Sequence, residues 1–112
     1  MLLAALCAAL AAPAAFAKSQ ATTLTGTVGP GFTITLKQGS KAVKSLKAGK
    51  YTFKISDKSN IHNFHLSGPG VNKKTSVSGT GSSTWTVTLK SGTYKFVCDP
   101  HASIMKGSFK VS

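Results

Sequence analysis

The chain has 112 residues, enough for one domain, and carries a formal net charge of +12 at pH 7. All fourteen basic side chains are lysine, and the only acids are Asp57 and Asp99. The absence of arginine disfavours specific nucleic-acid recognition, which uses bidentate guanidinium contacts. The excess positive charge favours an acidic partner or surface, the alternative being a solvated lysine surface that keeps the protein soluble.

The N-terminal segment has the features of a secretory signal peptide. Residues 2–12 are almost entirely apolar, and Ala15-Phe16-Ala17 matches an A-x-A cleavage signature. The run is too short to span a bilayer, which requires about 20 apolar residues. We therefore expect residues 1–17 to be cleaved and residues 18–112 to form one exported domain, periplasmic or extracellular. An uncleaved N-terminal anchor is the alternative.

Cleavage would leave Cys98 as the only cysteine of the domain. Small exported domains usually gain stability from disulfides, and one cysteine cannot form an internal disulfide. In an oxidising compartment a lone thiol would be oxidised or paired between chains unless something protects it. Metal ligation would give that protection, and a buried free cysteine is the alternative.

Alternating apolar and polar residues, typical of half-buried β-strands, dominate the rest of the chain. In chain order, the expected strands are 21–29, 32–36, a short edge or irregular crossing at 43–48, 51–55, 61–66, a short strand at 74–77, 85–89, 94–98 and 109–111. Turn signals recur between them about every 8–12 residues, and no stretch has a sustained helical period. The pattern predicts an all-β antiparallel sandwich or barrel with seven or eight strands.

Three potential metal ligands lie close together near the C-terminus: Cys98, His101 and Met105. A thiolate, an imidazole and a thioether suit copper among the common biological metals. Pro100 stiffens the turn between them and removes a backbone donor that could compete for the thiolate. Core packing is the alternative for Met105. A catalytic cysteine–histidine pair would also need an oxyanion-binding glycine nest, which is absent here, so we expect no enzyme activity.

Strand periodicity selects the histidine that would complete this site. His62 shares a face with the apolar Phe64 and Leu66, so it should point into the core. His65 should lie on the outer face with Asn63. We therefore expect His62 as the further ligand and His65 as a surface residue. The alternative for His62 is a core histidine hydrogen-bonded to a backbone carbonyl.

Two motifs together resemble the cupredoxins, the small blue copper proteins that include plastocyanin, amicyanin and pseudoazurin. These motifs are His62-Asn63 and Tyr94-x-Phe96-x-Cys98-x-x-His101-x-x-x-Met105-x-Gly107. The resemblance covers nearly all of the mature chain in strand order. It implies a Greek-key antiparallel β-sandwich that binds one type 1 copper ion.

The resemblance also implies individual roles. His62, Cys98 and His101 would be the trigonal copper ligands, and Met105 the long axial ligand. Asn63 would support the site by hydrogen bonds between the two ligand-bearing strands. His101 would be the exposed ligand through which electrons pass. Three residues separate His101 from Met105, one more than in amicyanin and one fewer than in plastocyanin.

The implied function is that of a soluble, monomeric single-electron carrier cycling between Cu(I) and Cu(II). Because the surface is basic, we expect redox partner proteins with an acidic docking surface, no specific nucleic-acid partner and no transmembrane segment. A copper carrier or storage module would use the same ligands. A metal-free exported interaction domain is the third alternative.

Overall fold

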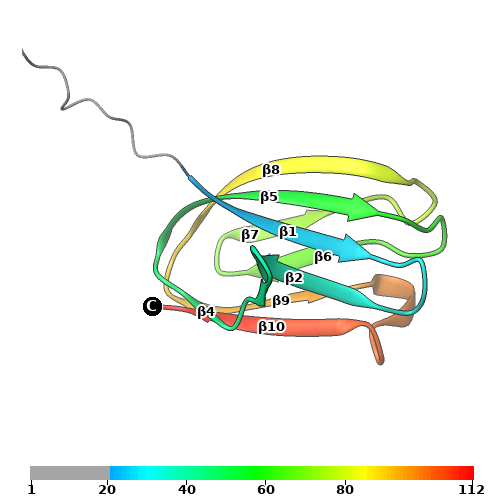
Figure 1. Cartoon of the computed structure of the whole chain (residues 1–112). Helices are drawn as coiled ribbons and strands as arrows, with labels where there is room; N and C mark the ends of the chain where they lie inside the picture. The colour runs from blue at the N-terminus through cyan, green and yellow to red at the C-terminus, as the bar shows by residue number, and fades with distance from the viewer. Residues whose placement is uncertain (1–20) are drawn as a thin grey trace, which may run out of the picture.

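Two five-stranded sheets make up the computed structural model, which describes residues 21–112 (Figure 1). The first sheet consists, in spatial order, of β3 (Lys41–Ala42), β2 (Ile34–Gln38), β1 (Thr22–Val28), β5 (Gly49–Asp57) and β8 (Gly81–Leu89). The second consists of β4 (Ser45–Leu46), β10 (Lys106–Val111), β9 (Gly92–Val97), β6 (His65–Gly68) and β7 (Val71–Lys74). The expected signal peptide, including its cleavage signature, lies outside the described residues.

The two sheets confirm the predicted all-β sandwich and differ from it in detail. There are ten strands, which include two short ones of two residues each: β3 lies just before the expected crossing at 43–48, and β4 lies within it. Both sheets are mixed, since β1 runs parallel to β5 and β4 parallel to β10. Within residues 21–112 there is one short 3-10 helix, η2 (Asp99–His101), and no helix long and apolar enough to cross a membrane.

Three local predictions were wrong. The strand expected at 61–66 begins only at His65, and residues 61–64 form a turn and an irregular segment. The short strand expected at 74–77 lies earlier, at β7, where it pairs with β6. Phe32 precedes β2 and is 55% exposed instead of facing the core. In each case a tertiary contact replaces the alternation that the sequence suggested.

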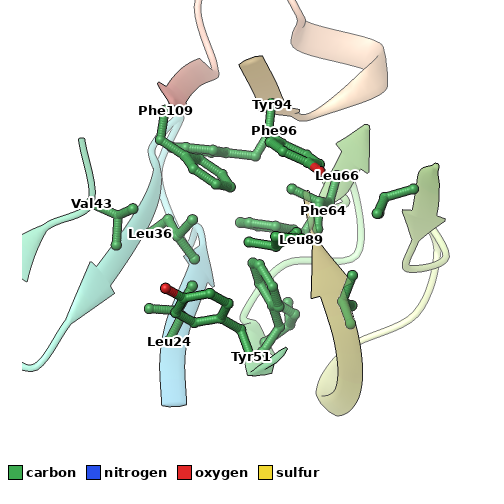
Figure 2. Packing of buried hydrophobic residues seen from close by; sticks show 14 of the residues in the cluster. Leu24, Leu36, Val43, Tyr51, Phe64, Leu66, Leu89, Tyr94, Phe96 and Phe109 are labelled. Carbon is green, nitrogen blue, oxygen red and sulfur yellow. The ribbon is translucent and has the colours of Figure 1, made fainter. Parts of the chain in front are cut away.

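Inward-facing residues of both sheets form one core, with stacked aromatic rings at its centre (Figure 2). Tyr94 stacks on Phe109 at a centroid distance of 5.4 Å, and Phe64 stacks on Phe96 at 5.6 Å. Such aromatic pairs add about 0.5–1.5 kcal/mol beyond their buried area. Because side chains alternate along β9, the same face continues from Tyr94 and Phe96 to Cys98, which is fully buried.

Two glycines make room for these aromatic rings. Gly107 on β10 lies opposite Phe96 on β9, and a Cβ built at Gly107 would collide with the Phe96 ring. A Cβ at Gly68 on β6 would collide with the ring of Tyr94 in the same way. The rings of Tyr94 and Phe96, both on β9, therefore lie directly against the backbone of the neighbouring strands.

We predict that Gly107→Ala lowers the free energy of unfolding of the metal-free protein by about 1–3 kcal/mol, because overpacking forces the Phe96 ring to move. Chemical denaturation would measure the change. Gly31→Ala is the matched control, since a Cβ there meets nothing within 4 Å, and its effect should stay within about 0.5 kcal/mol. Equal effects of the two substitutions would contradict this account of the packing.

Candidate metal centre

Two connections at one end of the sandwich supply the four predicted ligands. His62 lies in the irregular segment between β5 and β6. Cys98 directly follows β9, His101 ends η2, and Met105 directly precedes β10. The site therefore depends on how the β5–β6 and β9–β10 connections are held against each other.

Backbone hydrogen bonds close the β9–β10 connection into a tight loop. The Cys98 amide donates to the Met105 carbonyl at 3.0 Å, and the His101 amide donates to the Cys98 carbonyl at 3.0 Å. The Met105 amide in turn donates to the His101 carbonyl at 2.8 Å. Pro100 occupies the first turn of η2, where a missing amide hydrogen costs nothing. Cys98 and Met105 are thus fixed at the base of the loop, and both are fully buried.

Three donor atoms face one another at this end. His62 Nδ1 lies 3.1 Å from His101 Nδ1, and Cys98 Sγ lies 3.7 Å from the first and 3.6 Å from the second. A triangle with these sides has a central point about 2 Å from each of the three atoms. This distance is close to the bond lengths of about 2.0–2.3 Å that a metal such as zinc forms with nitrogen and sulfur ligands. The positions of the three donors therefore fit one metal ion.

The surroundings of His62 support the same conclusion. Its ring is fully buried, and its Nε2 atom has no hydrogen-bond partner in the described part of the chain. A metal bond at Nδ1 would fix the ring proton on Nε2 and hold the buried ring in one orientation. Two imidazoles and a thiolate with a neighbouring thioether form a donor set that suits copper.

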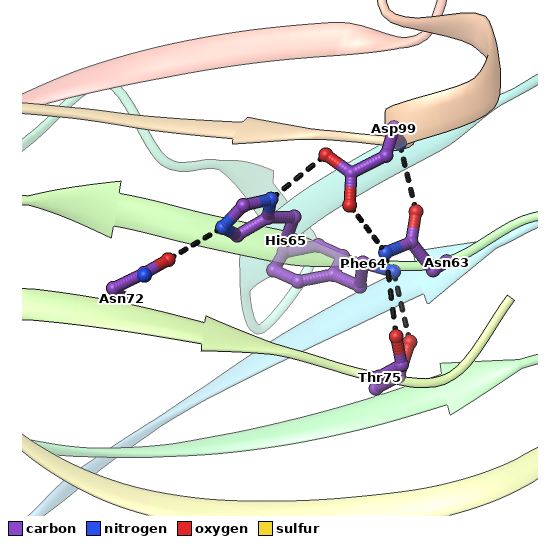
Figure 3. A network of polar contacts seen from close by, with 6 residues as sticks. All are labelled: Asn63, Phe64, His65, Asn72, Thr75 and Asp99. Atoms are coloured by element: carbon purple, nitrogen blue, oxygen red, sulfur yellow. Dashed lines mark hydrogen bonds and ion pairs between the residues drawn. The ribbon is translucent and has the colours of Figure 1, made fainter.

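Asn63 joins the two connections directly (Figure 3). Its Oδ1 accepts a hydrogen bond from the Asp99 amide at 2.8 Å, and its Nδ2 donates to Asp99 Oδ2 at 2.8 Å. The expectation that Asn63 lies on the outer face was wrong, because it is 1% exposed. The alternation rule fails here because residues 61–64 are not in a strand.

His65 lies outside the triangle of donor atoms, on the outer face as predicted. Its Nδ1 contacts Asp99 Oδ1 at 2.8 Å and its Nε2 contacts Asn72 Oδ1 at 2.6 Å (Figure 3). Burial lowers the pKa of His65, but hydrogen bonds with Asp99 and Asn72 and the Asp99 charge outweigh it and raise the pKa above its ordinary 6.5. Burial raises the pKa of Asp99, but its bonds with His65 and Asn63 outweigh it and hold the pKa below 3.8.

Sequence reasoning missed Phe32, whose ring contacts both histidines of the triangle. Its centroid lies 5.1 Å from that of His62 and 5.0 Å from that of His101, in edge-to-face geometry. The preceding Gly29-Pro30-Gly31 turn was the available signal, because it interrupts the strand and lets Phe32 leave the sheet. Sequence reasoning also missed that the side chain of Asp99 contacts Asn63 and His65. The available signal was its position between Cys98 and Pro100, in the loop that carries the ligands.

A family model described as "Cupredoxin-like domain" matches residues 1–111. The chain belongs to the cupredoxin-like family. No curated protein sequence matches it.

Solved structures of rusticyanin share the fold of this cupredoxin. A structure of the copper protein rusticyanin has a TM-score of 0.63 and 19% identity, covering 85% of this chain and 80% of that chain. A rusticyanin mutant has a TM-score of 0.62 and 20% identity, covering 85% of this chain and 80% of that chain. Rusticyanin from Thiobacillus ferrooxidans has a TM-score of 0.58 and 20% identity, covering 85% of this chain and 79% of that chain.

Copper is accordingly the cofactor of this cupredoxin. Two histidines, a cysteine and a methionine (His62, His101, Cys98 and Met105) are arranged as a type 1 copper site.

We predict that the His65–Asp99 pair stabilises the metal-free protein most in mildly acidic solution. The raised His65 pKa means that its contribution is complete below about pH 6.5 and is lost as the pH rises through the folded-state value. Because the lowered Asp99 pKa keeps that group charged above about pH 4, the difference in unfolding free energy between wild type and His65→Gln should be larger at about pH 5.5 than at about pH 8.5.

The side chains of this pair are 22% and 40% exposed, so the difference should be only about 0.2–1 kcal/mol. Urea denaturation at the two pH values measures it. A difference that grows with rising pH would contradict the ion pair.

Proposed function

We propose that this cupredoxin is a single-electron carrier of an exported compartment, with His62, Cys98 and His101 as the trigonal copper ligands and Met105 as the axial ligand. The observation that carries the proposal is the triangle of donor atoms at one end of the β-sandwich, with sides of 3.1, 3.6 and 3.7 Å. Copper supplies a one-electron change between Cu(I) and Cu(II). The exported compartment rests on the signal-peptide features of residues 1–17.

The task of the protein in such a reaction is to keep the ligand positions constant while the charge of the site changes. Two features of the chain do this. The loop from Cys98 to Met105 is closed by its own backbone hydrogen bonds. The β5–β6 connection is tied to that loop through Asn63. Because neither connection has to move, the rearrangement that accompanies electron transfer stays small.

Exposed apolar side chains surround the proposed electron port, His101. Among the described residues, the exposed large hydrophobic side chains are Phe32 (55%), Ile61 (49%) and Ile104 (64%). Phe32 contacts the His101 ring, the Ile104 amide donates to the His101 carbonyl, and Ile61 precedes His62. An apolar surface around a half-buried ligand lets a partner approach closely without displacing strongly bound water. We infer that redox partners dock here.

Charge would guide those partners to the docking surface. The chain has fourteen lysines against two acids, so a partner with an acidic surface is attracted from a distance. The same excess charge disfavours self-association, which agrees with a monomer. No residue of the chain is proposed to have a catalytic role.

We predict that copper-loaded protein has an intense thiolate-to-copper charge-transfer band that Cys98→Ala or His62→Ala abolishes, because each removes a ligand at the centre of the site. His65→Ala is the matched histidine control and should keep most of the band, since His65 lies outside the donor triangle. Absorption spectra after reconstitution with Cu(II) would measure the band. A colourless wild-type protein would exclude a type 1 site.

We also predict reversible voltammetry and fast electron exchange with an acidic c-type cytochrome. The exchange rate should fall on the order of tenfold or more between low and high ionic strength, because screening removes the attraction of the lysines. Stopped-flow spectroscopy over a salt series would measure the rate. A copper-loaded, coloured protein that exchanges electrons with no redox protein would instead support the copper storage alternative.

A further inference from the structure

Both carboxylate oxygens of Asp99 make polar contacts, and the two contacts are to different residues. Oδ2 accepts from Asn63 Nδ2 at 2.8 Å, on the buried side of the network. Oδ1 contacts His65 Nδ1 at 2.8 Å, on the exposed side (Figure 3). Asp99 directly follows Cys98, so the bonds of its carboxylate restrain the chain next to the residue that carries the thiolate.

His65 is itself held in place from its other side. Its Nε2 contacts Asn72 Oδ1 on β7 at 2.6 Å, while its backbone pairs with Val97 on β9. A chain of contacts therefore runs from β7 through His65 to Asp99 and the metal-binding loop. All of it lies outside the donor triangle, so its contacts hold the copper ligands only through the loop.

These contacts favour the charged form of His65. A carboxylate oxygen and an amide oxygen can only accept hydrogen bonds. With Asp99 Oδ1 at one ring nitrogen and Asn72 Oδ1 at the other, a ring that satisfies both contacts donates from both nitrogens. The geometry therefore fits an imidazolium cation that pairs with the Asp99 carboxylate, and the neutral ring satisfies only one of the two contacts.

We propose that His65 is a positioning residue of the copper site: through Asp99 it fixes the loop that carries Cys98 and His101, and its protonation raises the reduction potential. This inference rests on the proposed electron-carrier function. The reduced site carries one positive charge fewer than the oxidised site, so a cation nearby favours reduction. Loss of the proton leaves the Asp99 carboxylate uncompensated beside the site, which favours the oxidised form.

The other charges around His65 do not replace its effect. Lys74 lies opposite His65 on β7, and β9 presents the uncharged Val97 on the other side. Lys106, on the next strand β10, is paired with Val97. Both lysines are present in wild type and in His65→Gln, so their contribution cancels when the two proteins are compared. Asp99 is the anion that faces the His65 ring, and His65 is the group in this cluster with an ordinary pKa near neutrality.

His65→Gln tests the inference in both forms of the protein. In the copper-loaded form, the charge-transfer band should remain while copper release to a chelator becomes about threefold faster, because the loop is held less firmly. In the metal-free form, hydrogen exchange of the Asp99 amide, which donates to Asn63 Oδ1, should become faster by a similar factor. His65→Asn is a second variant that should behave in the same way.

The pH profile of the reduction equilibrium separates a positioning role from general stabilisation. In wild type, the equilibrium constant for reduction should increase about threefold as the pH falls from about 8.5 to about 5.5, and His65→Gln should lose most of that increase. Lys95→Gln is the matched control. It removes one cation from the same sheet without touching Asp99, so it should shift the equilibrium and keep the slope with pH.

An unchanged pH profile together with unchanged copper release in His65→Gln would overturn the inference. That result is distinguishable from failure of the proposed function, in which wild-type protein would lack the band or reversible voltammetry. Loss of the band in His65→Gln would also overturn it, because His65 would then be required for the ligands themselves.

Discussion

The metal centre depends on one constraint, the pair of hydrogen bonds between Asn63 and Asp99. Each is 2.8 Å long, and together they join two residues that are 36 positions apart in the sequence. Asn63 follows His62, and Asp99 follows Cys98, so the pair sets the spacing between ligands of different connections. A single hydrogen bond would allow rotation about its axis, whereas two bonds to one amide group fix both distance and orientation. The buried position of Asn63 strengthens the constraint, since an unpaired amide there would be costly.

Packing in the core also holds the strand that leads to Asp99. Phe96 stacks on Phe64 and lies over Gly107, so the strand that ends at Cys98 is held on two sides before it reaches the loop. The buried ring of His62 gains no hydrogen bond at Nε2 within the described residues. The cost of leaving this buried nitrogen unpaired remains when a metal binds Nδ1, whereas the metal gives Nδ1 and the buried Cys98 sulfur a common partner. Stability and metal affinity are coupled for this reason.

The exposed end of the molecule combines two kinds of surface. Apolar side chains cluster next to the histidines, and lysines are distributed over both sheets. The proposed long-range attraction by the lysines and the proposed short-range apolar contact at His101 would act at different distances, so one would speed association while the other would permit rapid release. The His65–Asp99 pair lies outside the triangle of donor atoms.

Much of this was determined by the sequence alone. Period-2 alternation predicted a β-sandwich, and the short spacing from Cys98 to Met105 predicted a metal site with sulfur and imidazole donors. The expectation that His62 is buried agrees with the structure, although the alternation behind it does not apply because His62 is not in a strand. The resemblance to cupredoxins, which fixed the fold family, was confirmed by the family match. These features are local, since they follow from residues a few positions apart and from the way side chains alternate along an extended chain.

Only the tertiary structure decided what depends on distant segments meeting. It placed Asn63 in the interior, moved Phe32 from the core to the histidine rings and brought Asp99 between Asn63 and His65. It also made two of the strand pairings parallel. No local pattern encodes such contacts, because irregular segments lack a fixed period and because a carboxylate binds whichever donors the fold brings to it. The sequence could therefore name candidate ligands, while the packing of the two sheets decided what holds them in place.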